Sequence, residues 1–172
     1  MRAALAGPTV LAAAALLIAC SPASHSIQLT GTAPPAPTAT LSLPSYLDPS
    51  SSWIEIDLTR QVLALHEAGR VAAEYPVSTG VTTDPKYATP PDLYQVQAKD
   101  KGPIESAPGV FVSNIVLFDL GRGNGIHSLP MDAQGTVLDA TVGTPATAGC
   151  VRVAEAADVY EFAQIGMRVW IH

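Results

Sequence analysis

The chain has 172 residues, a formal net charge of −6 at pH 7 and a pI near 5.0. It contains no block of lysine and arginine, which excludes nucleic acid as an expected partner. Its cysteines and histidines show no metal-ligand spacing, so we expect no metal site.

The first 20 residues, MRAALAGPTVLAAAALLIAC, have the build of a secretory signal peptide. Arg2 forms a short basic region, and the apolar run over 3–19 is at or below the minimum length of a membrane-spanning helix. Leu17 to Cys20 is similar to a bacterial lipobox, which predicts a signal peptide over 1–19 and a lipid on Cys20. The alternative is an ordinary signal peptide with a chance cysteine.

Residues 20–50 are dominated by proline, serine, threonine and alanine, which predicts a tether with little to pack. Its reach would be roughly 90 Å as polyproline II or roughly 30 Å as a flexible coil. We therefore expect an exported protein that is lipid-anchored in the cell envelope, in the periplasm or at the outer face of the membrane. A lipidated Cys20 could not form a disulfide, so Cys150 would be a lone thiol in an oxidising compartment.

Residues 51–172 are enough for one domain with one core, and their first half reads as strands. Alternating polar and apolar residues predict a tight hairpin of Ser52–Leu58 against Gln61–His66. A third strand ends near Pro76, and the Gly-, Asp- and Pro-containing segment 79–92 reads as a loop.

The second half predicts further strands and one helix. Residues 93–99 alternate, 109–120 form the longest β-like run, which we place at the centre of the sheet, and 125–128 form a short extended piece. Apolar residues at spacings of three and four predict a helix over 153–166, and 167–172 give a last strand. The expected fold is mainly β, a sandwich or partly closed barrel, with one helix after Cys150.

The lone thiol is the first candidate for chemistry. At pH 7 only about three per cent of an ordinary cysteine is thiolate, so a nucleophilic cysteine needs a base, usually histidine. His66 is expected at the surface or a sheet edge, and His172 is the last residue, whereas His127 follows glycines and precedes Pro130, as in a loop-built cleft. The alternative is that Cys150 packs in the core and His127 is solvated.

The motifs IHSLP, TAGCVRV and GMRVWIH, together with the opening WIEIDLTRQVLALHEAGRVAAEYPVSTG, resemble the L,D-transpeptidase catalytic domain, the YkuD-like family. The likeness covers residues 52–172 in the family's order. Three features depart from it. Ala148 stands where the family has histidine, the spacing from His127 to Cys150 is 23 residues, and the usual Thr-Pro-Thr-Gly is Thr89 to Asp92, TPPD.

The resemblance implies that Cys150 attacks the stem-peptide carbonyl and that His127 is its base. A backbone carbonyl at Ser128 would orient the imidazole, and backbone N–H groups at Ala148, Gly149 and Cys150 would bind the oxyanion. Thr147 matches the family's Ser/Thr position. Arg152 matches the Arg/Asn position, where it would orient the site or contact an acidic substrate, unless it forms a salt bridge with a helix carboxylate.

The implied partner is the peptidoglycan stem peptide, with no metal or organic cofactor, and we expect a monomer. The thioester would pass to an amine, as in cross-linking or protein attachment, or to water, as in an L,D-carboxypeptidase. A catalytically degenerate peptidoglycan-binding lipoprotein and a purely structural envelope lipoprotein are the alternatives of another class. A sortase-like enzyme is disfavoured, because sortases place histidine much further before cysteine.

Overall fold

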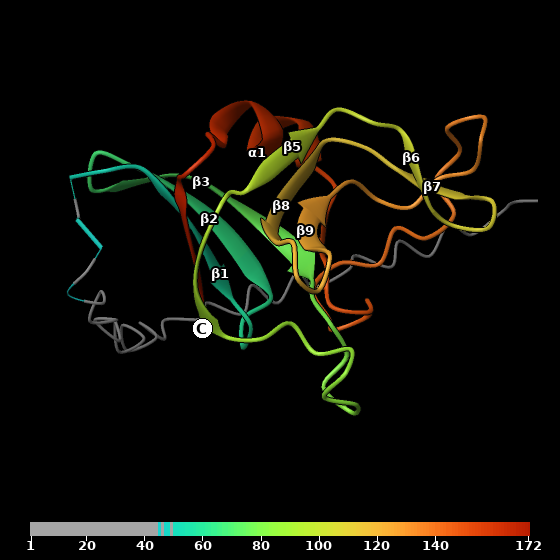
Figure 1. Ribbon diagram of the computed structural model, residues 1–172, viewed down its shortest axis with the longest axis horizontal. Coiled ribbons are helices and arrows are strands. Elements are labelled where there is room, and N and C mark those ends of the chain that lie inside the picture. The colour runs from blue at the N-terminus through green and yellow to red at the C-terminus, as the bar shows by residue number, and fades with distance from the viewer. Residues whose placement is uncertain (1–44, 46, 49) are drawn as a thin grey trace, which may run out of the picture. The chain divides into compact units, whose positions relative to one another are not determined.

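The computed structural model describes residues 45, 47, 48 and 50–172 (Figure 1). The predicted signal peptide, the lipidation of Cys20 and nearly all of the tether lie outside the described residues. In the described part of the chain, no helix is long and apolar enough to span a membrane.

The described chain forms strands and a single short helix, in keeping with its predicted mainly-β class. Nine strands join one sheet in the order β4-β11-β1-β2-β3-β10-β9-β8-β5, and β6 and β7 form a separate hairpin. The elements are β1 Trp53–Asp57, β2 Val62–Glu67, β3 Arg70–Ser78, β4 Asp92–Gln95, β5 Ala98–Asp100, β6 Ile104–Ala107, β7 Val110–Val112, β8 Ile115–Asp119, β9 Asn124–His127, β10 Val151–Val153, α1 Ala156–Phe162 and β11 Arg168–Ile171.

The order of strands requires the large sheet to curl. Its two edge strands, β4 and β5, are neighbours in the sequence and are separated only by Val96 and Gln97. These two residues bridge the edges, because Val96 N–H donates to the Met167 carbonyl and Gln97 N–H to the Leu117 carbonyl. The predicted partly closed barrel is therefore confirmed.

The predicted opening hairpin is confirmed, with β1 and β2 antiparallel and Trp53 opposite His66. Both faces of β1 are buried, since Trp53 and Ile54 are each at most 1% exposed. The third strand runs past Pro76 to Ser78, because Val77 N–H donates to the Gln61 carbonyl.

The later strands differ from the prediction. The run 93–99 breaks into β4 and β5, and the run 109–120 breaks at Asn114, whose φ of 51° cannot continue a strand. The second part of that run, β8, is next to the edge strand β5 and not at the centre of the sheet. The helix is shorter than predicted because Val153 pairs with Val77 of β3.

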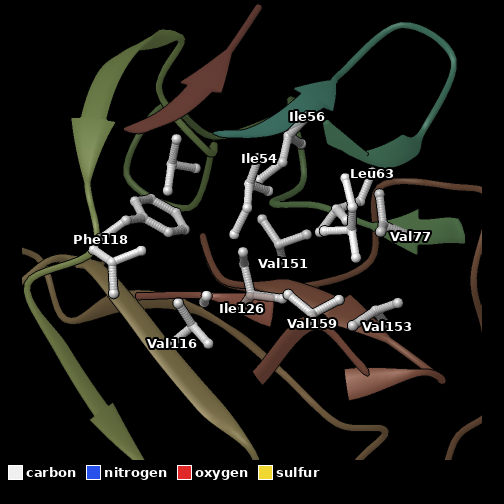
Figure 2. Packing of buried hydrophobic residues seen from close by; sticks show 14 of the residues in the cluster. Ile54, Ile56, Leu63, Val77, Val116, Phe118, Ile126, Val151, Val153 and Val159 are labelled. Carbon is white, nitrogen blue, oxygen red and sulfur yellow. The ribbon is translucent and has the colours of Figure 1, made fainter. Parts of the chain in front are cut away.

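The core lies inside the curl of the sheet and includes Val159 of α1 (Figure 2). Lys99 of β5 holds the end of that helix, because its ammonium donates to the carbonyls of Tyr160 and Ala163. The buried cluster comprises Ile54, Ile56, Leu63, Leu65, Val77, Val96, Val116, Phe118, Ile126, Val151, Val153, Ala156, Val159, Ala163, Val169 and Ile171.

Candidate active site

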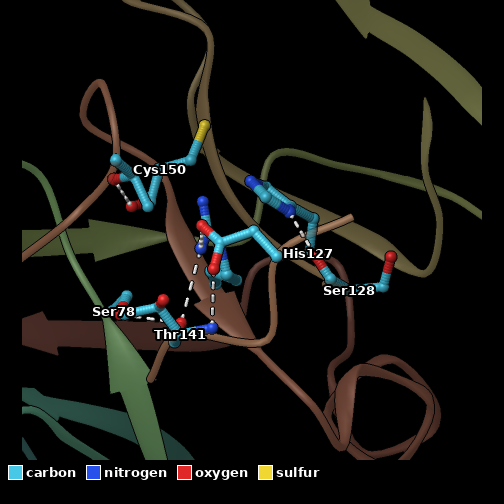
Figure 3. A network of polar contacts seen from close by, with 8 residues as sticks. Ser78, His127, Ser128, Thr141 and Cys150 are labelled. Atoms are coloured by element: carbon cyan, nitrogen blue, oxygen red, sulfur yellow. Dashed lines mark hydrogen bonds and ion pairs between the residues drawn. The ribbon is translucent and has the colours of Figure 1, made fainter. Parts of the chain in front are cut away.

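Two parallel strands bring the predicted nucleophile and base together. β9 and β10 pair with Val151 opposite Ile126 and Arg152 opposite His127, which places Cys150 level with Gly125. Because side chains alternate along a strand, Cys150 and His127 belong to the same face, with their Cα atoms roughly 8 Å apart on strand spacings. Figure 3 shows the thiol and the imidazole from these adjoining strands.

Glycine at position 125 leaves space on this face. A Cβ there would lie 2.8 Å from the Val116 carbonyl oxygen, so a side chain could not be accommodated. The loop before Cys150 is equally constrained, because Gly149 has φ +117° and a Cβ on it would lie 2.7 Å from Asn124 Oδ1. The buried Asn124 amide therefore packs directly against the backbone that precedes Cys150.

The loop between β3 and β4 also holds the cysteine segment. The buried Thr89 hydroxyl accepts the Gly80 N–H at 2.8 Å and donates to the Gly149 carbonyl at 2.9 Å. At the exit of β3, the Thr79 carbonyl accepts the N–H of Thr147 at 3.0 Å. The peptide before Cys150 is thus fixed from two sides by residues far away in the sequence.

Cys150 and His127 line the same cavity, which has a volume of about 270 Å³. Gly123 and Gly125 also line this cavity. Most of the remaining wall is apolar and comes from β6, β7 and β8, namely Ile104, Val112, Ile115 and Leu117, with Ser106. A pocket with few polar groups and an apolar wall is typical of a small-molecule or peptide site.

The His127 ring is oriented by its neighbour, as the family resemblance implies. Its Nδ1 lies 2.7 Å from the Ser128 carbonyl oxygen and donates to it, so in the neutral ring Nε2 is an acceptor. Burial lowers the pKa of His127 below its ordinary value of 6.5, and the charge of Arg152 lowers it further against the opposing effect of the Ser128 hydrogen bond. At neutral pH the imidazole is therefore a free base.

The Cys150 thiol is partly exposed and forms no disulfide with the described residues. Its Sγ donates to the Gly123 carbonyl at 3.8 Å, while the described residues show no hydrogen bond from it to the His127 ring. Burial raises the pKa of the thiol above 9.0, opposed by a backbone hydrogen bond at Gly125. At neutral pH the two shifts favour a neutral thiol and a neutral imidazole on the same face of the sheet.

Arg152 of β10 pairs with His127 of β9 and is 9% exposed. Its Nη1 donates to Asp139 Oδ2 at 2.6 Å and to the Thr141 carbonyl at 3.4 Å. The alternative prediction, a salt bridge between Arg152 and a helix carboxylate, is therefore wrong, because its partner Asp139 lies in the loop between β9 and β10. Arg152 ties this loop to the strand that carries the cysteine.

The other predicted residues surround the thiol in different ways. Thr147 Oγ1 donates to the Cys150 carbonyl at 2.6 Å and accepts the Gly149 N–H at 3.3 Å. Because the Gly149 N–H is already hydrogen-bonded, the N–H groups of Ala148 and Cys150 are left as candidate oxyanion donors. Ala148 is exposed. The prediction that His66 lies at the surface or at a sheet edge is wrong: its side chain is 12% exposed and stacks on Trp53, and its strand β2 lies between β1 and β3.

Sequence reasoning missed two supporting residues, Thr89 and Asn124. Thr89 belongs to the segment in which the family motif is altered, and the surviving threonine was the available signal. Asn124 lies between two glycines, a pattern that indicates a close backbone approach without saying which backbone.

The model of the L,D-transpeptidase catalytic domain family, YkuD, matches residues 51–171. The chain therefore belongs to this family, as the motifs around His127 and Cys150 indicated. A search of curated proteins gave no match.

Solved structures agree with the fold. An L,D-transpeptidase from Xylanimonas cellulosilytica is 27% identical with a TM-score of 0.55, and the match covers 72% of this chain and 61% of that one. L,D-transpeptidases from Mycobacterium tuberculosis and Mycobacterium smegmatis are each 20% identical, with TM-scores of 0.55 and 0.54; the matches cover 70% of this chain and 57% and 58% of theirs. This chain thus spans less than two thirds of each of those chains.

Proposed function

We propose that the chain is a peptidoglycan L,D-transpeptidase that passes the acyl group of a tetrapeptide stem through a Cys150 thioester to an amine acceptor. The observation that carries the proposal is the shared cavity of Cys150 and His127, with the imidazole oriented by the Ser128 carbonyl. Family membership supports the reaction class, and the acyl transfer by these residues is our inference.

In the first half-reaction, a change of the Cys150 side-chain rotamer turns the thiol from the Gly123 carbonyl toward His127. His127 Nε2 accepts the thiol proton while sulfur bonds to the carbonyl carbon of the third stem residue. The N–H groups of Ala148 and Cys150 stabilise the oxyanion, each such donor contributing about 3 kcal/mol in other enzymes. The bond to D-alanine then breaks, and the imidazolium returns its proton to the departing amine.

In the second half-reaction the acceptor amine attacks the thioester. His127 takes a proton from the attacking nitrogen and returns it to sulfur as the carbon–sulfur bond breaks, which leaves a new amide and a free thiol. Water in place of the amine yields a shortened stem peptide with a free carboxylate. The same cysteine chemistry thus serves cross-linking, protein attachment and carboxypeptidase activity, and the acceptor alone distinguishes them.

The test is turnover of a disaccharide-tetrapeptide by the chain and by its Cys150→Ala and His127→Ala variants, with products identified by mass. We expect D-alanine release by the wild type and loss of all acyl transfer in Cys150→Ala with circular dichroism unchanged. For His127→Ala we expect a loss of at least about a hundredfold, the lower range of acid–base catalysis. Retained turnover in Cys150→Ala, or a rate within a few-fold in His127→Ala, would reject the assignment.

The degenerate peptidoglycan-binding lipoprotein is the second candidate, because Ala148 replaces the family histidine and the thiol pKa is raised. A binding module has no use for an activated thiolate. The rate of Cys150 alkylation against pH separates the two: His127-dependent reactivity at neutral pH supports the enzyme, and titration as an isolated buried thiol supports the binding module.

The location in the cell envelope is proposed from the sequence alone. We propose that Cys20 carries the lipid and that residues 20–50 hold the catalytic domain away from the membrane. Labelling of the expressed chain with a palmitate analogue is expected to mark the wild type and not Cys20→Ala. Equal labelling of both would overturn the lipid anchor without bearing on the chemistry at Cys150.

A further inference from the structure

A second cavity adjoins the cysteine loop, on the side of Ala148. Its volume is about 370 Å³, and it is lined by Pro85, Lys86, Arg122, Asn124 and Ala148. These residues come from the β3–β4 loop, the β8–β9 turn, the start of β9 and the cysteine loop. Ala148, which stands where the family has histidine, contributes only a methyl side chain to this lining.

This cavity is close to the nucleophile. Ala148 is two residues before Cys150, so their Cα atoms are at most about 7 Å apart. Asn124, 5% exposed, lines the cavity and also contacts the Gly149 backbone. Segments 122–125 and 148–150 therefore separate the two cavities, one apolar with the thiol and imidazole, the other polar.

The second cavity is cationic in a chain whose net charge is −6. Among the residues that the structure describes, the Lys86 ammonium has no carboxylate within ion-pair distance; it lies 5.1 Å from the centre of the Tyr87 ring. Arg122 has one weak partner, with its Nε 4.0 Å from Asp119 Oδ2. Asp84 is engaged by the Lys86 backbone N–H at 2.9 Å. Because the ion pair of Arg122 with Asp119 is long and Arg122 is exposed, a ligand carboxylate can readily replace Asp119.

The positions of the two cavities decide which part of a stem peptide would face the cations. The departing D-alanine amine must face His127 to receive its proton, so the leaving group lies on the apolar side. The cavity beside Ala148 is then open to the group that stays bound to Cys150. In a stem peptide, that retained part carries carboxylates on its second residue and, where the third is diaminopimelate, on the side chain of the third residue.

We propose that Lys86 and Arg122 form a subsite for a carboxylate on the retained acyl part of the donor, and that they select stems in which it is free over stems in which it is amidated. The inference rests on the proposed function for the identity of the donor. It also predicts salt sensitivity, because both cations are exposed and the screening length is about 8 Å at 0.15 M ionic strength.

The test separates binding from turnover. The full-length Cys150→Ala variant is titrated calorimetrically with four tetrapeptides: unmodified, amidated on the second residue, amidated on the side chain of the third, and amidated on the terminal D-alanine. We expect one of the two internal amides to bind roughly three- to tenfold more weakly and the terminal amide to bind as the unmodified peptide does. Adding Lys86→Gln and Arg122→Gln should abolish that preference.

Arg70→Gln is the matched control, because it removes one positive charge at the start of β3 and should leave the preference unchanged. Equal affinity for all four peptides, sensitivity to the terminal amide alone, or a preference that survives the double substitution would overturn the subsite. A wild type that binds with this preference but releases no D-alanine would refute the proposed function and leave the subsite standing.

Discussion

At the scale of single residues, the candidate site combines two opposite pKa shifts with one cause. Burial lowers the pKa of His127 and raises that of Cys150, since each shift favours the uncharged form. The pair at rest is therefore neutral, and the proposed reaction depends on transfer of the thiol proton to the imidazole when a carbonyl is present.

The pH profile follows from these directions. Protonation of His127 removes the base, and its lowered pKa moves the acidic limb of kcat/KM below pH 6.5, while the raised thiol pKa moves the basic limb above pH 9. We expect a broad plateau between these limbs, measured as D-alanine release from pH 4.5 to 10. An acidic limb centred above pH 7 would contradict the neutral pair.

Gly149 occupies a backbone conformation and a space that a side chain would disturb, directly before Cys150. Gly149→Ala combines a positive φ with a Cβ 2.7 Å from Asn124 Oδ1, so we expect at least about a hundredfold loss of turnover from a displaced Cys150. Gly135→Ala, with φ +83° and open space around its Cβ, isolates the conformational cost. Comparable activity losses in the two variants would show that contact with Asn124 is unimportant.

At the scale of elements, several hydrogen bonds from residues 79–89, between β3 and β4, hold the cysteine segment in place. The pairing of the strands could be predicted from the sequence only in part. The opening hairpin follows from alternation, and the order of His127 and Cys150 from motifs, but the parallel pairing of β9 with β10 joins segments that no local pattern links. The break at Asn114 and the pairing of Val153 are likewise set by the tertiary fold.

Thr89 tests the role of the β3–β4 loop. Thr89→Val keeps the shape of the side chain and removes both hydrogen bonds, to Gly80 N–H and to the Gly149 carbonyl. We expect a loss of about 1–3 kcal/mol in the free energy of unfolding and a lower kcat with little change in KM. Thr89→Ser restores the hydroxyl and should recover most of kcat. A serine variant as slow as the valine variant would assign the effect to packing.

At the scale of the whole domain, the end of the chain is fastened to the first strand. Strand β11 pairs in parallel with β1, and His172 exchanges backbone hydrogen bonds with Ile56 and Leu58. Glu55 then joins two strands, with its carboxylate oxygens 2.6 Å from His66 Nε2 and 2.9 Å from His172 Nε2. The sequence did not predict this arrangement, because only the order of strands in the sheet brings Glu55, His66 and His172 together.

Glu55→Gln tests that fastening. The hydrogen bond from His66 is the main cause that holds the pKa of Glu55 below 4.5, so the ionised carboxylate stabilises the fold above that pH and the contribution is lost as pH falls through the lower folded value. We expect Glu55→Gln to lower the free energy of unfolding by about 1–3 kcal/mol at pH 7 and to narrow its difference from wild type toward pH 3. Denaturant titrations check this, with the exposed Glu67→Gln as control; an unchanged difference at all pH values would contradict it.

The central claim is that Cys150 forms an acyl-enzyme, and the most direct measurement is the intact mass of the full-length chain after mixing with a disaccharide-tetrapeptide and, separately, with a carbapenem. The proposed mechanism predicts an adduct on Cys150 equal to the donor less D-alanine in the first case, and a carbapenem adduct on the same residue in the second. A folded chain whose thiol can be alkylated but that remains unmodified by both would contradict the enzyme and leave a peptidoglycan-binding domain with an inactive site.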